Sequence, residues 1–346
     1  MNSAQRPFYI GKRRAMSSMI DDLLNPAYLP DETEQVSLVQ THISMVIIAD
    51  QFVYKIKKPV DFGFLDFTTL DKRYYYCNQE ITLNRRLSRG LYLGVVPVVH
   101  DGTHYRMGQG QGRVVEYAVK MRRLPEEMLM KSVFLRGELS EGQLQRIADV
   151  LAGFHGSALH SPEIDAFGDP EAFKVNTDEN FSQTEKYIGT TIRKEDFNEL
   201  KRWTSSCYTS LRSAFLGRVR DKRIRDCHGD LHMEHICLTK DIPIFDCIEF
   251  NDRFRYTDTL NDIAFLLMDL EYHGGNRHST ILWDFYREHA QERDVKPILA
   301  FYKVYRAYVR GKVTSFQLDD ERIEPGKKEE AVETARRYFQ LARSYL

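Results

Sequence analysis

The sequence predicts an α+β fold with two lobes, a small antiparallel sheet that carries one helix and a larger, mainly helical region. Three observations lead to this prediction. Short β-rich runs gather between residues 37 and 121, apolar residues at helical spacing dominate after residue 125, and 346 residues suffice for about two domains. We therefore expect an accessory segment at 1–35, a first lobe at 36–121 and a second lobe at 122–346.

The first lobe reads as β-rich runs separated by turn residues, a pattern typical of hairpins. Asp101-Gly102 favours a tight hairpin because this dipeptide tolerates positive φ. The glycine cluster Gly108–Gly112 leads into another strand and not into a helix, so we interpret it as a hairpin loop and not as a dinucleotide-binding fingerprint. The expected elements are the strands Ser37–Gln40, Ser44–Ile48, Phe52–Lys57, Val95–Val99, His104–Met107 and Val114–Met121, with a helix at Leu70–Leu87.

The second lobe is expected to be helical with three short β runs. Apolar stripes recur at helical spacing, as in the series Leu144, Ile147, Leu151 and Phe154. The expected helices near the end of the chain are Leu260–Glu271, Ile298–Phe316 and Lys328–Tyr345, and the β runs are Ile224–Cys227, Ile236–Leu238 and Ile242–Phe245.

Charge and cysteine content exclude several classes of protein. Lys and Arg total 49 against 50 Asp and Glu, a net charge of −1, so no overall field attracts nucleic acid or an anionic membrane. The five cysteines are odd in number and form no CxxC, which argues against a disulfide framework and a zinc ribbon. No signal peptide and no apolar run of about 20 residues is visible. We expect a cytoplasmic protein.

The residues with the clearest chemistry lie between Cys227 and Glu249. Asp230 is the last residue of a His-Gly-Asp triplet that follows a short β run, and Asp246 ends a second β run sixteen residues later. Phosphoryl transfer needs two such carboxylates, one to accept the proton of an attacking hydroxyl and one to hold a metal ion on the phosphates. The pattern therefore predicts Asp230 as the base and Asp246 as the metal ligand.

These motifs resemble the aminoglycoside phosphotransferase-like family of the protein-kinase-like superfamily. His228–His232 looks like the catalytic loop of that family, and Phe245-Asp246 looks like its metal-binding aspartate. Val53–Phe67 and Phe245–Asp258 are similar to stretches of uncharacterised bacterial phosphotransferase-like proteins. Many of these are fused to a P-loop kinase domain, and because this chain contains no GxxxxGK[ST] we expect none here. The resemblance implies a protein-kinase-like fold.

The resemblance also implies that Asp262 braces the catalytic loop and that a strand lysine pairs with a helix glutamate to orient the nucleotide phosphates. Lys55 and Lys57 alternate along one strand and share a face, so their positions alone do not separate them. The resemblance favours Lys55 as the phosphate lysine. Glu80, on the one helix of the first lobe, is the expected partner.

Three further residues are candidates for nucleotide binding. The turn between the first two strands contains no glycine, and Ser44 could donate its hydroxyl or its backbone N–H to a phosphate. Met121 and Arg123 lie in the stretch Met121–Pro125, where related folds offer main-chain groups to adenine. Leu124 would complete an apolar slot there.

His235 departs from the family pattern, which has a metal-binding asparagine at this position. Imidazole suits Zn²⁺, Mn²⁺ or iron better than Mg²⁺. His235 could therefore ligate a metal, contact a phosphate as a cation, or mark the loss of a second metal site. The three histidines His228, His232 and His235 lack an acidic or thiolate fourth ligand at metal spacing and do not predict a zinc site.

Together these observations predict an ATP-dependent phosphotransferase that uses Mg²⁺, or Mn²⁺, to phosphorylate a hydroxyl of a small molecule. The expected substrate side, Glu249–Asp258 and Asp269–His278, mixes acidic and basic residues and does not favour a polycation. Two alternatives remain, a nucleotide-binding pseudokinase and an enzyme that moves AMP onto a protein. We expect no nucleic-acid or membrane partner.

Overall fold

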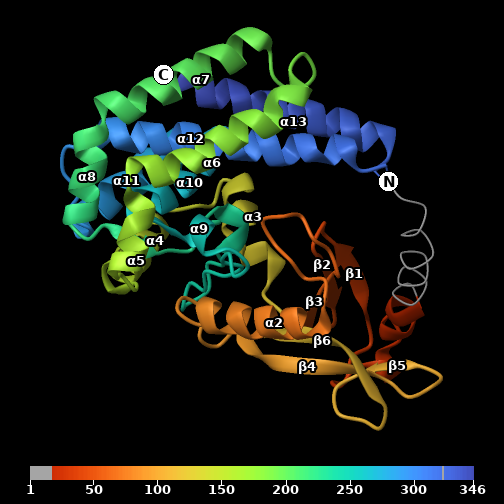
Figure 1. The fold of residues 1–346 in the computed structure, drawn as a ribbon. Helices are drawn as coiled ribbons and strands as arrows, with labels where there is room; N and C mark the ends of the chain where they lie inside the picture. The colour runs from red at the N-terminus through yellow and green to blue at the C-terminus, as the bar shows by residue number, and fades with distance from the viewer. Residues whose placement is uncertain (1–17, 322) are drawn as a thin grey trace. The chain divides into compact units, whose positions relative to one another are not determined.

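The computed structural model describes residues 18–321 and 323–346 (Figure 1). The chain divides into two compact units, and each is described by itself. Unit 1 comprises the chain up to Glu126 together with Pro243–Asn251, and unit 2 comprises Glu127–Ile242 and Asp252–Leu346. Of the accessory segment predicted at 1–35, residues 1–17 lie outside the described residues. The α+β class predicted from the sequence is confirmed.

Unit 1 is an antiparallel sheet with one long helix. Its strands follow the order β1-β2-β3-β6-β4-β5, and α2 packs on β6 and β4 (Figure 1). Residues 18–23 are helical and precede the 3-10 turn η2. The elements are η2 (Pro26–Tyr28), β1 (Ser37–Gln40), β2 (Ser44–Ile48), β3 (Phe52–Lys57), α2 (Leu70–Asn84), β4 (Tyr92–His100), β5 (Tyr105–Met107) and β6 (Arg113–Arg122).

The alternation of side chains along β3 gives the sheet of unit 1 a different core on each face. Tyr54 and Ile56 are buried on one face, in a cluster with Ala118. Their neighbour Lys55 pairs in register with Val119 of β6, which packs against the helix residue Cys77. The lysines of β3 therefore face α2.

Unit 2 is mainly helical. Helix α12 packs along α13 and α10, and α4 packs against α11 (Figure 1). The longer helices are α4 (Glu141–Ser157), α6 (Pro170–Thr184), α7 (Lys194–Ser210), α8 (Arg212–Arg220), α10 (Thr259–Tyr272), α11 (Asn276–His289), α12 (Lys296–Ser315) and α13 (Pro325–Ser344). The shorter elements are η3 (Glu126–Met128), which begins in unit 1, α3 (Met130–Leu135), α5 (Pro162–Asp165), η4 (Ala166–Gly168), η5 (Glu185–Tyr187), η6 (Met233–His235), α9 (Asp252–Arg255) and η7 (Phe316–Asp319).

Two of the β runs expected from the sequence do not form strands. The run Ile224–Cys227 corresponds to β7 (Ile224–Asp226), which pairs with β8 (Tyr256–Asp258), a strand the sequence did not reveal. The runs Ile236–Leu238 and Ile242–Phe245 contribute only isolated bridges. Their apolar residues reflect burial in a loop region and not strand pairing, since Ile236 and Ile244 are both 0% exposed.

Helix α10 is the central element of unit 2. Every residue from Thr259 to Leu270 is buried. The side chain of Asp258 caps the helix by accepting the N–H of Leu260, which satisfies one of the free donors of the first turn. This burial places the carboxylate of Asp262 in the interior of the unit. In the described part of the chain, the helices are all too short or too polar to cross a membrane.

The close packing of α12 against α13 predicts different effects for two helical glycines. A Cβ at Gly311 would lie 2.8 Å from ring atoms of the buried Phe339, whereas at Gly217 of α8 the nearest atom is 3.7 Å away, on the flexible side chain of Arg220. We expect Gly311→Ala to lower the free energy of unfolding by about 1–3 kcal/mol because the ring has no room to move. Urea denaturation measures this change.

Gly217→Ala is the matched control. It should leave the free energy of unfolding unchanged or raise it by up to about 1 kcal/mol, since alanine has the higher helix propensity. Equal effects of the two substitutions would contradict the packing argument.

Candidate functional site

A cluster of five charged side chains in unit 1 contains most of the residues predicted to bind nucleotide phosphates and metal. Lys55 Nζ lies 3.0 Å from Glu80 Oε1 and 2.5 Å from Asp246 Oδ1. Lys57 Nζ lies 2.6 Å from Glu80 Oε2 and also bonds to Glu249. The structure thus brings the predicted residues Lys55, Glu80 and Asp246 together, and it adds Lys57 and Glu249.

Three parts of the chain position this cluster. The lysines lie on β3 and face α2, and Glu80 lies on the buried side of α2. The segment Pro243–Asn251 supplies the other two carboxylates. Two buried side chains hold that segment by its main chain: Tyr92 Oη accepts the N–H of Asp246 at 3.1 Å, and Asn84 Oδ1 accepts the N–H of Cys247 at 2.9 Å.

Asp246 has an unusual backbone conformation. Its φ is 60°, in the left-handed region that non-glycine residues seldom occupy, although aspartate tolerates it better than most. Such a conformation costs free energy and persists only where surrounding contacts hold it in place. The hydrogen bonds that the N–H groups of Asp246 and Cys247 donate to Tyr92 and Asn84, together with the ion pair with Lys55, provide these contacts.

The buried charges of the cluster shift one another's pKa values. Burial opposes the charged form of Lys55, but Asp246 and Glu80 raise its pKa well above the ordinary value. The pKa of Lys57 is raised in the same way, against burial, by Glu249 and Glu80. Burial would raise the pKa of Glu80, but the two lysines lower it. For Glu249, burial raises the pKa by more than the two lysines lower it, so the pKa is raised. Lys55, Lys57 and Glu80 are therefore charged at neutral pH.

Three other predicted nucleotide-binding residues of unit 1 are not members of the charged cluster. Ser44 is 1% exposed and pairs in register with Lys57, while its backbone N–H already donates to Thr41 Oγ1 at 2.9 Å. Only its hydroxyl is left for a ligand. Met121 lies near the end of the central strand β6, and the backbone N–H of Arg123 donates to Gln51 O at 2.8 Å.

Unit 2 carries the predicted catalytic loop, which Asp262 organises. The carboxylate of Asp262 accepts the N–H of His228 at 2.9 Å and the N–H of Gly229 at 2.8 Å. A third contact joins it to His155 Nε2 at 3.1 Å. Arg306 donates to the carbonyl of Gly229 at 2.9 Å from the adjacent helix α12. The bracing role predicted for Asp262 is confirmed by these contacts.

Asp230 lies beside two histidines and near Arg310. Its carboxylate is 3.6 Å from His232 Nε2 and 3.7 Å from His235 Nδ1, and its side chain is 36% exposed. Burial would raise the pKa of Asp230, but His232, His235 and Arg310 hold it well below its usual range. His228 Nδ1 accepts the N–H of Asp230 at 3.3 Å, so His228 orders the loop. Asp230 is ionised at neutral pH and accessible.

The two predicted metal ligands differ in how well they fit Mg²⁺. Asp246 offers carboxylate oxygens on a side chain that is 40% exposed, and oxygen ligands suit this hard cation. His235 offers an imidazole nitrogen, which suits transition metals better than Mg²⁺. Asp246 therefore fits a magnesium ion and His235 does not.

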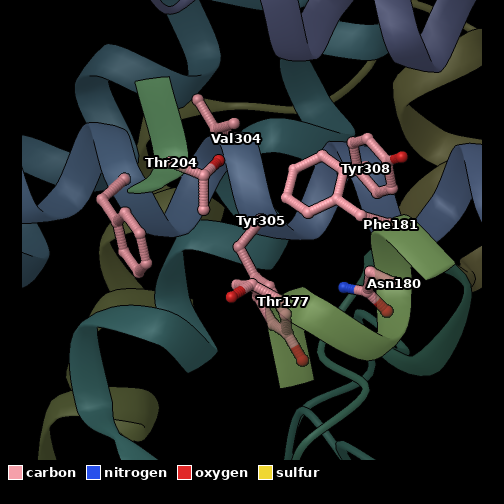
Figure 2. A pocket seen from close by; sticks show the side chains of 8 residues that line it. Thr177, Asn180, Phe181, Thr204, Val304, Tyr305 and Tyr308 are labelled. Carbon is pink, nitrogen blue, oxygen red and sulfur yellow. The ribbon is translucent and has the colours of Figure 1, made fainter. Parts of the chain in front are cut away.

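A small cavity in unit 2 lies apart from the predicted site residues. It opens among α6, α7 and α12, and Figure 2 shows threonine, asparagine and aromatic side chains around it. Its volume is about 10 Å³, room for about one water molecule. It contains no charged group and cannot hold a nucleotide. Its lining residues are Thr177, Asn180, Phe181, Thr204, Phe301, Val304, Tyr305 and Tyr308.

A lysine–glutamate–aspartate cluster on a small antiparallel sheet and a His-Gly-Asp loop in a helical unit are features of a kinase-like fold. The chain belongs to the phosphotransferase enzyme family, whose model matches residues 76–302. The resemblance predicted from the motifs is thereby confirmed.

Two kinds of comparison place the chain beside known proteins, one by sequence and one by fold. The chain is 30% identical over 322 residues to uncharacterised proteins of Mycobacterium tuberculosis and Mycobacterium bovis, covering 93% of this chain and 62% of each relative's length. A choline/ethanolamine kinase family protein from Mesorhizobium loti has a similar fold, with a TM-score of 0.51 and 14% sequence identity over 95% of this chain and 99% of that one. The chain thus spans less than two thirds of the mycobacterial relatives.

Sequence reasoning missed the contribution of Lys57 and Glu249. The strand alternation placed Lys57 beside Lys55 but gave no reason for two lysines to be buried together. Glu249 was expected on the substrate side, yet it is 7% exposed and bonds to Lys57. The only signal in the sequence is the two-residue spacing of Lys55 and Lys57, which places both lysines on one face of β3.

Removal of Lys57 tests its pairing with Glu80 and Glu249. Lys57→Met leaves the buried carboxylates of Glu80 and Glu249 with too little positive charge, and we expect the free energy of unfolding to fall by about 3–5 kcal/mol. The double variant Lys57→Met/Glu249→Leu removes both charges and should recover most of this loss. Urea denaturation of the two single variants and the double variant measures the coupling. Additive losses would show that Lys57 and Glu249 do not depend on each other.

The Asp262 brace predicts a pH dependence of stability. Burial would raise the pKa of Asp262, but His155, His228 and Arg306 lower it well below the ordinary value. Because the folded state then binds fewer protons than the unfolded state, the stabilisation exists above roughly pH 4 and is lost as the pH falls further. Asp262→Asn should lower the free energy of unfolding by about 1–3 kcal/mol at pH 7 and flatten its decline in acid. An unchanged acid profile would contradict this role.

Proposed function

We propose that the protein transfers the γ-phosphoryl group of ATP to a hydroxyl group of a small molecule. The observation that carries the proposal is the position of the Lys55 ammonium, bonded at once to Glu80 and Asp246 in unit 1. A lysine held in this way presents a fixed positive charge to phosphate oxygens, and phosphoryl transfer depends mainly on positioning and charge stabilisation. The family assignment supports the same chemistry.

Each charged residue has a part in the proposed reaction. Lys55 would turn from Asp246 toward the nucleotide phosphates, with Glu80 keeping it charged and in place. Asp246 would hold Mg²⁺, which when bound supplies positive charge to the phosphate oxygens. Lys57 and Glu249 would hold β3 against the segment that carries Asp246 while the Lys55 ammonium moves from Asp246 to a phosphate oxygen.

Asp230 of unit 2 is the proposed acceptor of the substrate proton. Its carboxylate is ionised and partly exposed, and the loop that carries it is fixed by Asp262. A base in a rigid loop needs little reorganisation when a hydroxyl binds, which lowers the barrier to proton transfer.

Replacement of Asp230 tests this assignment. We expect Asp230→Asn to lower γ-phosphoryl transfer by about 10²–10⁴-fold, the usual contribution of a general base, while ATP affinity changes little. The measurement uses γ-labelled ATP, Mg²⁺ and pools of hydroxyl-bearing metabolites, with ATP binding followed by calorimetry. Asp178→Asn, a change at an exposed residue of α6, is the control. Transfer at the wild-type rate in Asp230→Asn would overturn the role of Asp230.

The same assay distinguishes the alternatives. Label that moves to protein from α-labelled ATP and not from γ-labelled ATP would replace phosphoryl transfer by AMP transfer. Binding of ATP with no transfer to any pool, with Mg²⁺ or Mn²⁺, would identify a nucleotide-binding pseudokinase. Removal of divalent ions with a chelator should abolish transfer, and Mg²⁺ should restore it.

A further inference from the structure

The catalytic loop contains a set of metal-ligand atoms. Asp230, His232 and His235 each offer one such atom, and these atoms lie within 4.8 Å of one another. From the sequence, the trio His228, His232 and His235 predicted no zinc site, because it lacked an acidic or thiolate ligand. In the structure His228 accepts the N–H of Asp230, and the side chain of Asp230 takes the third place. The missing acidic ligand is therefore the predicted base itself.

Hydrogen bonding in the loop prepares His235 for a metal. His235 Nδ1 lies 2.8 Å from the backbone carbonyl of Asp230. Since a carbonyl only accepts, Nδ1 carries the proton in this contact, and in the neutral form of the ring the lone pair lies on Nε2. Histidines that ligate metals commonly donate their other ring N–H to a backbone carbonyl in this way, which fixes the tautomer.

The ligand types indicate which metals the set would prefer. Two imidazoles and one carboxylate, with positions left open, are typical of zinc, manganese and iron(II) sites and not of magnesium sites. The ring centroids of His232 and His235 are 3.9 Å apart, and one nitrogen of each ring lies near Asp230 Oδ2, at 3.6 Å for His232 and 3.7 Å for His235.

A second candidate set, His155, Cys227 and Asp262, does not carry the same inference. Its ring nitrogens already bond to Tyr286 and Asp262, and Asp262 accepts two backbone N–H groups of the loop. All three side chains are buried. In contrast, the side chain of Asp230 is 36% exposed, so an ion can reach it.

We propose that Asp230, His232 and His235 form a binding site for a transition-metal ion, with Zn²⁺ the best match, and that the bound ion inhibits the enzyme. An ion on the carboxylate of Asp230 occupies the lone pairs that would accept the substrate proton. The inhibition rests on the proposed function, whereas the binding does not. The site differs from the magnesium ligand Asp246 both in position along the chain and in ligand chemistry.

Metal binding is tested without nucleotide or substrate. The full chain is freed of metal with a chelator and titrated with Zn²⁺ against a chromophoric competitor, and Co²⁺ absorption reports nitrogen ligation. We expect one tight site in the wild type, and an affinity at least about 10-fold weaker in His235→Asn and in His232→Asn, because each variant loses a direct ligand. Circular dichroism confirms that the variants are folded.

His160→Asn is the matched control, since it removes an exposed imidazole of unit 2 outside the set and should bind Zn²⁺ like the wild type. Equal zinc affinity in the wild type, His232→Asn and His235→Asn would overturn the site. So would the lack of a Co²⁺ spectrum with nitrogen ligation in the wild type.

Inhibition is measured as the ratio of transfer rates with and without one equivalent of Zn²⁺ at constant Mg²⁺. The ratio should fall at least about 10-fold in the wild type and stay near one in His235→Asn. Zinc binding without any phosphotransferase activity would support the metal site and contradict the proposed function. Activity that is indifferent to bound zinc would overturn the inhibition.

Discussion

The contact of one buried glutamate with two lysines is the interaction on which unit 1 depends. Glu80 is 0% exposed and lies within ion-pair distance of both Lys55 and Lys57. An unpaired charge at such a depth would cost several kcal/mol, so α2 can pack on the sheet only where the lysines meet it. The same lysines then hold Asp246 and Glu249. One electrostatic requirement thus aligns a helix, a strand and a segment from much later in the chain.

Unit 2 uses a buried carboxylate for a similar purpose but compensates it differently. Asp262 is 0% exposed, and its carboxylate accepts two backbone N–H groups and contacts His155 rather than lysines. Hydrogen bonds of this kind fix the orientation of a main chain as well as neutralising charge. They leave the side chain of Asp230 as the exposed acid of the loop. In each unit a fully buried carboxylate positions a more exposed one that can reach a ligand.

Much of this arrangement follows from local patterns. The strands of unit 1, helix α2 and the Asp101-Gly102 hairpin were all visible as residue spacing or turn chemistry. The secondary-structure prediction was wrong where a buried loop and a buried strand have the same apolar sequence pattern. Ile236–Leu238 is apolar because it is buried in a loop, and periodicity in so short a run does not separate this from a strand.

The sequence by itself determined the family and most of the secondary-structure elements, because motifs such as His-Gly-Asp and strand alternation are local properties. Only the tertiary structure decided which charges are partners. Lys57 and Glu249 are 192 residues apart, and no local rule relates them. Likewise, only the folded loop replaced His228 by Asp230 in the group of metal-ligand atoms. Partnership between buried charges depends on distance and desolvation, and both are set by how the whole chain packs.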